Sequence, residues 1–154
     1  MANTYNNDLL YDYLCIIRDG YRTGNFEPLF PLLDEDVVMH SAWVLAPNEG
    51  KDHVVSYYRA KSPALRDNDM PIDFYIVELV RGGGPRSAPS PRASLWYPDG
   101  KLALYMVQYL PHEVADLILD LTLTPEGKIS RIDLCIQGLF QFKPYSERET
   151  DPQF

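Results

Sequence analysis

The fold is decided by residues 24–44, GNFEPLFPLLDEDVVMHSAWV, and by residues 50–58, GKDHVVSYY. The first stretch predicts a small helix over 26–33 and then a valine-rich strand over 37–45. After a short turn, a second helix is expected over 51–61. This order indicates a layer of helices over a curved sheet, with a cavity between the two.

Prolines set the limits of both helices. Pro28 suits a first helical turn, but Pro31 removes another backbone donor, so the first of these helices must be short or partly 3₁₀. Ser62–Pro63 is expected to end the second. The buried side of that second helix is indicated by residues at three- and four-residue spacing: Val54, Tyr57, Tyr58 and Lys61.

An earlier helix is predicted over 7–20, with Asn7 as its N-cap and Gly20 as its stop. Tyr13 lies four residues before Ile17 and therefore on nearly the same face. The apolar stripe of this helix consists of Leu10, Leu14, Ile17 and Tyr21.

The second half of the chain reads as meandering strands, separated by a Gly/Pro-rich loop over 82–91 and by tight turns. Helices that precede such strands favour an α+β fold in which the helices cover one face of a mostly antiparallel sheet. The strands are expected over 72–81, 93–97, 101–110, 117–124 and 128–137.

Composition sets further bounds. With 154 residues, the chain is expected to form one domain, with its core over about 8–140 and a tail over 141–154. A net charge of −8 argues against nucleic acid as a partner. No apolar run reaches membrane-span length and the start lacks a secretory signal, so a cytoplasmic protein is expected. The two cysteines have no CxxC spacing, and the three histidines are scattered, so neither a metal nor another cofactor is expected.

The order of elements and several short motifs resemble the NTF2-like superfamily, including its SnoaL-like and ketosteroid isomerase-like proteins. The resemblance implies a conical α+β fold that holds a small, largely apolar or aromatic molecule in a pocket, and a homodimer formed through the sheet. The residues that match the family's pattern are Gly24, Phe26, Leu29, the segments 33–40 and 50–58, and Gly127, Lys128, Ile129 and Arg131.

Set against this resemblance, the steroid-isomerase chemistry is missing. The position of the family's aspartate base falls on Ser41, that of its hydrogen-bonding tyrosine on Ile17, and that of its second acid on Leu119. Serine is no base near neutral pH, and neither aliphatic side chain stabilises an oxyanion. A family tyrosine is retained at Tyr58.

The related polyketide cyclases use an acid late in the chain, and the candidates here are Asp116, Asp120 and Asp133. Strand alternation puts Asp120 and Asp133 on the face opposite the neighbouring leucines and isoleucines. If the aliphatic face lines the cavity, both acids face out, and cross-strand pairing of Asp120 with Arg131 is the structural explanation.

His40 is the candidate general base, because it is a titratable group among apolar residues on the first strand. A purely structural histidine is the alternative, and alternation puts His40 and Ser41 on opposite faces unless the strand bulges. The pocket is expected to be lined by Tyr13, Ile17, Ser41, Trp43, Tyr58, Leu119, Ile132 and Leu134.

The sequence therefore favours a small-molecule pocket protein that acts as an acid–base isomerase, cyclase or lyase without the steroid-isomerase residues. A non-catalytic binding module or dimeric assembly module of the same fold is the alternative, since one fold hosts many functions.

Overall fold

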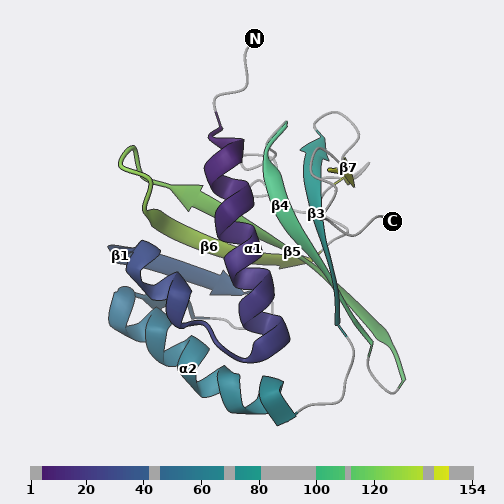
Figure 1. Ribbon diagram of the computed structural model, residues 1–154, viewed down its shortest axis with the longest axis horizontal. Coiled ribbons are helices and arrows are strands. Elements are labelled where there is room, and N and C mark those ends of the chain that lie inside the picture. Colours follow the sequence, from purple (N-terminus) through teal and green to yellow (C-terminus); the bar gives the residue numbers. More distant parts are fainter. Residues whose placement is uncertain are drawn as a thin grey trace.

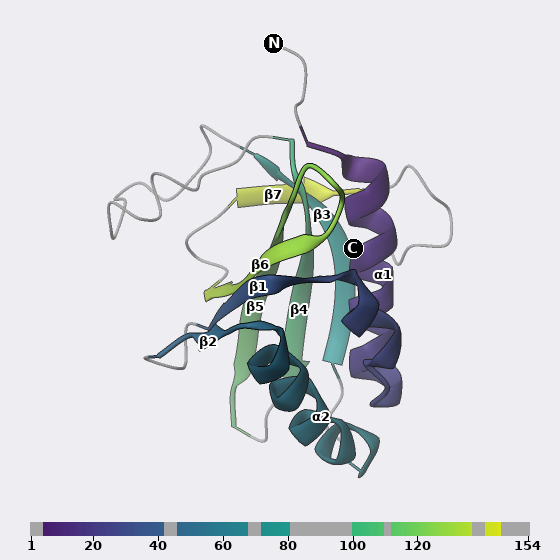
Figure 2. The ribbon, with the colours of Figure 1, turned by 90° about the vertical axis from the view of Figure 1, so that its left-hand side faces the viewer.

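Helices cover the concave face of a strongly curved sheet (Figures 1 and 2). The computed structural model describes residues 5–41, 46–67, 72–80, 100–109, 112–136 and 141–145. The helices are α1 (Asn7–Thr23), the 3₁₀ helix η1 (Glu27–Leu32) and α2 (Lys51–Asp67). The strands are β1 (Leu33–Ser41), β2 (Asn48–Glu49), β3 (Ile72–Val80), β4 (Leu102–Tyr109), β5 (Val114–Leu123), β6 (Ile129–Ile136) and β7 (Gln141–Pro144).

The N-terminus of α1 is held by two asparagines. Asn6, rather than the predicted Asn7, is the N-cap, and its side chain accepts a hydrogen bond from the Leu9 N–H at 3.2 Å. Asn7 instead joins the helix to the sheet. Its amide donates to the Gly100 carbonyl at 2.8 Å and accepts from the Leu102 N–H at 3.2 Å. The helix is therefore anchored to the start of β4.

The prediction that α1 stops at Gly20 is wrong. The helix runs on to Thr23 and is capped by Gly24, whose φ of +77° is a left-handed conformation that favours glycine. Gly20 has a different role, since it leaves room for the Phe26 ring. A Cβ at position 20 would come within 2.4 Å of that ring. That glycine lets the chain after the helix turn back and pack tightly against it.

The second predicted helix end is also wrong, since α2 continues through Pro63 to Asp67. In the turn before the proline, the Ser62 hydroxyl donates to the Tyr58 carbonyl at 3.0 Å. Packing of α2 against β1 and α1 outweighs the local preference of proline to end a helix.

The sheet has the order β2-β1-β6-β5-β4-β3-β7, and every described pairing is antiparallel except that of β1 with β6. β1 begins at Leu33, before the predicted position 37, because Leu33 is already in register with Ile129 of β6. The predicted α+β, mostly antiparallel, curved-sheet architecture is confirmed.

The predicted tail begins with a strand, because β7 pairs with the edge of β3. The loop predicted over 82–91 and the strand predicted over 93–97 lie outside the described residues. Within them, β4 pairs with β3 and β5.

The main hydrophobic core lies between the helices and the concave face. Ile17 of α1, Tyr58 of α2 and Leu119 of β5 are all fully inaccessible to solvent there. A smaller apolar cluster on the opposite face contains Val77 and Ile118. The curved sheet is therefore packed on both sides over part of its area.

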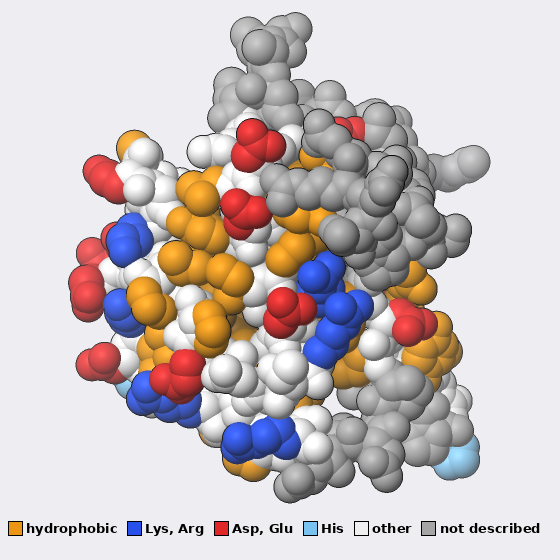
Figure 3. All heavy atoms as spheres, viewed as in Figure 1, with side chains coloured by type: hydrophobic (Ala, Val, Ile, Leu, Met, Phe, Trp, Pro, Cys, Tyr) orange, Lys and Arg blue, Asp and Glu red, His pale blue; other side chains and the backbone are white. Residues whose placement is uncertain are grey.

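The face that carries α1 and α2 has a mixed surface. Figure 3 shows acidic and basic side chains interspersed over its described part, with hydrophobic side chains between them. Arg59 and Glu27 form one of the exposed ion pairs, at 3.1 Å. No helix among the described residues has the length and apolar character needed to span a membrane.

Candidate functional site

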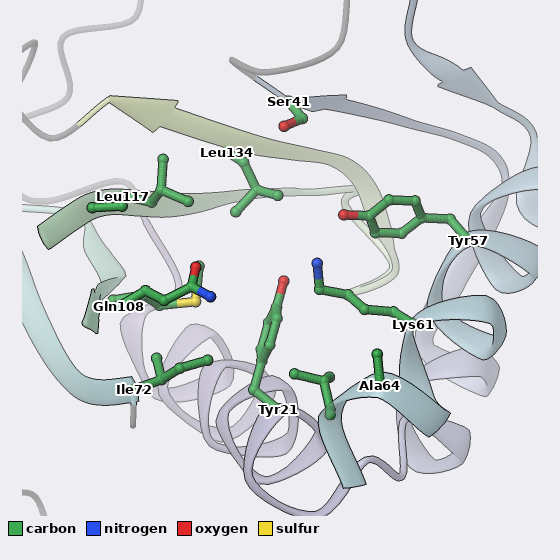
Figure 4. Close-up of a pocket in the computed structure, with 12 residues that line it drawn as sticks. Tyr21, Ser41, Tyr57, Lys61, Ala64, Ile72, Gln108, Leu117 and Leu134 are labelled. Carbon is green, nitrogen blue, oxygen red and sulfur yellow. The ribbon is translucent and has the colours of Figure 1, made fainter. Parts of the chain in front are cut away.

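A cavity of about 220 Å³ opens between the helices and the concave face of the sheet (Figure 4). It is bounded by the end of α1, the second half of α2 and five strands. The described lining residues are Tyr21, Ser41, Tyr57, Lys61, Ala64, Leu65, Ile72, Met106, Gln108, Ala115, Leu117 and Leu134.

Strand alternation explains which sheet residues reach this cavity. Ser41 shares the face of the buried residues Val37 and Met39. On β5, Leu117 shares the face of the core residue Leu119. The sheet thus continues its core-facing side directly into the cavity, which makes this part of the wall mostly apolar.

Polar atoms enter from several elements. Figure 4 shows the Lys61 ammonium and the Tyr21 and Tyr57 hydroxyls directed toward the interior, with Ser41 and Gln108 on the sheet side. The Lys61 Nζ lies 5.5 Å from the centroid of the Tyr57 ring and 5.9 Å from that of Tyr21. Both rings are within cation–π range, so they favour a charged amine at this position.

Two tyrosines of the cavity lining, Tyr21 and Tyr57, lie beside Lys61, and Tyr58 is buried in the core behind them. Burial, followed by the nearby Tyr57, raises the pKa of Tyr21. Burial also raises the pKa of Tyr58 well above its usual value, and Tyr21 and Tyr57 add to that rise. The Tyr58 hydroxyl approaches that of Tyr21, but it has no partner with hydrogen-bond geometry among the described residues. Tyr21 and Tyr58 are therefore neutral phenols near neutral pH, able to donate a proton in a hydrogen bond.

The predicted pocket residues separate into two groups. Ser41 and Leu134 line the cavity. The others that the structure describes, apart from Tyr13, lie in the core beneath it: Ile17, Tyr58, Leu119 and Ile132. Trp43 lies outside the described residues.

Tyr13 is buried away from the described cavity lining, next to the turn between β5 and β6. Its hydroxyl donates to the Gly127 carbonyl at 2.6 Å, which joins α1 to the turn between β5 and β6. Burial, with a smaller effect of Asp12, raises its pKa. Tyr13 is thus engaged in a structural contact away from the described cavity lining.

His40 lies on the face of β1 opposite Ser41, as alternation requires. It is half-buried, in register with Asp133 of the parallel strand β6, and is not among the described residues that line the cavity. Its role as a general base stays a prediction.

The three late acids all interact with other side chains. Asp116 accepts a hydrogen bond from the Tyr105 hydroxyl at 2.9 Å. The ion pair of Asp120 is with Lys101, whose Nζ lies 2.8 Å from Oδ1, and the charge of Arg131, its predicted partner, has a smaller favourable effect on it. Arg131 instead contacts Asp133, two residues along its own strand, at 2.9 Å.

Asp120 and Asp133 are in register on neighbouring strands and are both buried, with 7% and 3% of their surface exposed. Burial raises the pKa of Asp120, and Lys101 offsets part of that rise. The Lys101 contact is an ion pair without hydrogen-bond angles. Neither acid is among the described lining residues of the cavity.

Tyr21, Tyr57, Lys61 and Gln108 line the cavity but were not predicted as pocket residues. Tyr21 already stood in the apolar stripe of α1, and Tyr57 and Lys61 on the buried side of α2, so helical periodicity carried part of the signal. For Gln108, there was no indication of a site residue in the sequence beyond its place in a predicted strand. Among the described residues, no group of three or more His, Cys, Asp or Glu side chains could hold a metal ion.

No protein-family model matches the chain, and no curated protein matches it in sequence. Its structure is similar to an NTF2-like protein of unknown function from Mesorhizobium loti, with a TM-score of 0.60 and 9% identity, covering 89% of this chain and 98% of that one. A steroid delta-isomerase from Pseudomonas aeruginosa gives a TM-score of 0.56 at 14% identity, covering 88% and 84%.

A third similar structure is SalBIII, an epoxide hydrolase/cyclase-like enzyme that functions in pyran ring formation in the polyether salinomycin. Its TM-score is 0.51 at 16% identity, covering 88% of this chain and 94% of that one. The resemblance to the NTF2-like superfamily is thereby confirmed at the level of the fold, and the chain has the NTF2-like fold.

Proposed function

We propose that this protein binds a small, largely apolar molecule in the cavity between α2 and the sheet. The observation that carries this proposal is the composition of the wall. Aliphatic side chains such as Leu117 and Leu134 are combined with a few convergent polar groups, as is typical of small-molecule sites.

The size of the cavity limits the ligand. Pockets for drug-sized molecules hold about 300–1,000 Å³, and this one holds about 220 Å³. A compact molecule with one ring or a short chain suits this volume better than a steroid.

The enzymatic form of the proposal is acid–base isomerisation or cyclisation. Steroid-isomerase and cyclase-like enzymes share the fold, which supports a related activity without assigning one. Proton transfer here would depend on the hydroxyls of Tyr21 and Tyr57, on Lys61, or on His40 if β1 changes its local geometry. No carboxylate is among the described lining residues, so chemistry based on a carboxylate gains no support from them.

The alternative is a binding module without catalysis. The replacement of the three steroid-isomerase groups by Ser41, Ile17 and Leu119 favours it for that particular reaction. The two forms differ in one observable: an enzyme converts a bound molecule into a product of changed structure or mass, and a binding module releases it unchanged.

Native mass spectrometry of freshly purified protein tests the proposal, because it detects small molecules retained in the cavity. A matched pair of variants locates them. Ala64→Phe fills the cavity, whereas Ala60→Phe alters an exposed position on the same helix that is not part of the described lining. Retained mass in wild type and Ala60→Phe, but not in Ala64→Phe, supports the proposal. Equal retention by all three proteins contradicts it.

The cytoplasmic location and the homodimer through the sheet stay predictions. Light scattering after size exclusion tests the dimer, and a monomer at micromolar concentration would contradict it.

A further inference from the structure

Lys61 is a cation in a cavity wall, and none of the wall residues that the structure describes is a carboxylate. Among the described lining residues it is the only charged group. No acid among the described residues lies within ion-pair distance of its Nζ, although the chain carries 22 acids against 14 bases. On the same helix, Lys51 and Arg59 both contact glutamates, at 3.9 and 3.1 Å.

The surroundings of Lys61 fit an anion better than a neutral polar group. The Tyr57 and Tyr21 rings flank the ammonium, and their hydroxyls face the same interior space (Figure 4). The Tyr21 phenol is protonated near neutral pH, and burial raises its pKa further, so it is available as a hydrogen-bond donor. An ammonium and phenol donors that converge in a partly water-excluded cavity form a receptor for an anionic oxygen.

The rest of the cavity has a different character. Across from the ammonium, Leu117, Leu134 and Ile72 form an apolar wall. A ligand that satisfies both parts has one anionic end and an apolar body. The small volume excludes long chains and large ring systems.

We propose that the ligand is a small monocarboxylate, held with its carboxylate against Lys61 Nζ and the Tyr57 and Tyr21 hydroxyls and its apolar body against the sheet. This inference rests on the proposed function, since it names the ligand class of the same cavity. A charge-assisted contact of this kind distinguishes a carboxylate from a neutral isostere by about 10- to 100-fold in affinity.

The test is an NMR titration of isotopically labelled protein with three probes of equal carbon skeleton: hydrocinnamate, hydrocinnamamide and hydrocinnamyl alcohol. Wild type is expected to bind hydrocinnamate about tenfold or more tightly than the other two, with shifts at cavity residues such as Gln108 and Leu134. Lys61→Met is expected to remove this preference and Lys61→Arg to retain it. Lys51→Met, which alters a lysine outside the described lining, is the matched control and keeps the preference.

The outcomes separate the two proposals. Equal binding of all three probes in the cavity, or an unchanged preference in Lys61→Met, overturns the carboxylate inference and leaves the apolar-ligand proposal standing. Binding of inorganic phosphate in competition with hydrocinnamate would assign the site to anions in general and overturn the monocarboxylate class. If no probe binds and the Ala64→Phe comparison also shows no difference, both proposals fail.

Discussion

Two lysines at two places in the cone show how differently one residue type is used. Lys101 is buried, with 7% of its surface exposed, and its ammonium contacts Asp120 at 2.8 Å. Lys61 is half-buried in the wall of a cavity and has no acid partner among the described residues. The charge of a buried cation such as Lys101 is balanced by a counter-ion within the same chain. The Lys61 cation faces a mostly apolar cavity, where the carboxylate ligand that we propose would be its counter-ion.

The largest expected effect is on stability, at Lys101. Lys101→Met leaves the Asp120 carboxylate buried without its partner, which costs about 3–5 kcal/mol of unfolding free energy. Urea unfolding measures the loss. The double variant Lys101→Met/Asp120→Leu removes both charges and is expected to recover most of it, because an apolar pair often replaces a buried ion pair without loss.

The same pair predicts a pH dependence. Because burial raises the folded-state pKa of Asp120, the acid favours the fold when it is protonated, and this contribution is lost as the pH rises through that pKa. Without Lys101 the pKa rises further. The cost of Lys101→Met is therefore expected to be larger at pH 8 than at pH 5. A cost that grows toward low pH would show that the ion pair is not the cause.

A second, smaller effect is expected at Gly20, where packing connects the core to the cavity. A Cβ at this position would meet the Phe26 ring, and Phe26 packs against both Tyr21 and Tyr58. Gly20→Ala is therefore expected to cost about 1–3 kcal/mol by overpacking. It should also shift the NMR signals of Tyr57 and Gln108, because Tyr21 is displaced.

Gly20→Ala should lower the unfolding free energy and also shift the NMR signals of cavity residues, whereas Lys101→Met should lower the unfolding free energy alone. A variant of wild-type stability with an unchanged cavity spectrum would contradict the packing described around Phe26.

The smallest effect on stability is expected at Lys61. Lys61 contacts no acid among the described residues and loses only its cation–π contacts in Lys61→Met, so the unfolding free energy should change by no more than about 1 kcal/mol. A loss of several kcal/mol in the same urea experiment would mean that Lys61 is a structural cation like Lys101, and the comparison between the two would no longer hold.

Local patterns predicted the architecture well, because helix periodicity and strand alternation report which side of an element is buried. They failed where a contact with a residue distant in sequence determines where a helix ends. Gly20 reads as a helix stop, but its smallness serves the approach of Phe26. Pro63 reads as a helix end, but α2 is held by packing on its neighbours.

The site was less predictable than the fold for the same physical reason. Cross-strand pairing was expected to join Asp120 to Arg131, yet the ammonium of Lys101, just before β4, forms the ion pair with it. Alternation correctly separated Ser41 from His40. The meeting of Tyr21, Lys61 and Gln108 depends on how α1 and α2 lie on the curved sheet, and no short pattern encodes that arrangement.

The most direct test is a crystal structure of the protein grown with hydrocinnamate. The ligand is expected in the cavity, with its carboxylate about 2.7–3.2 Å from Lys61 Nζ and its ring against Leu117 and Leu134. An empty cavity at saturating hydrocinnamate, or a ligand whose carboxylate points to solvent away from Lys61, would contradict this expectation.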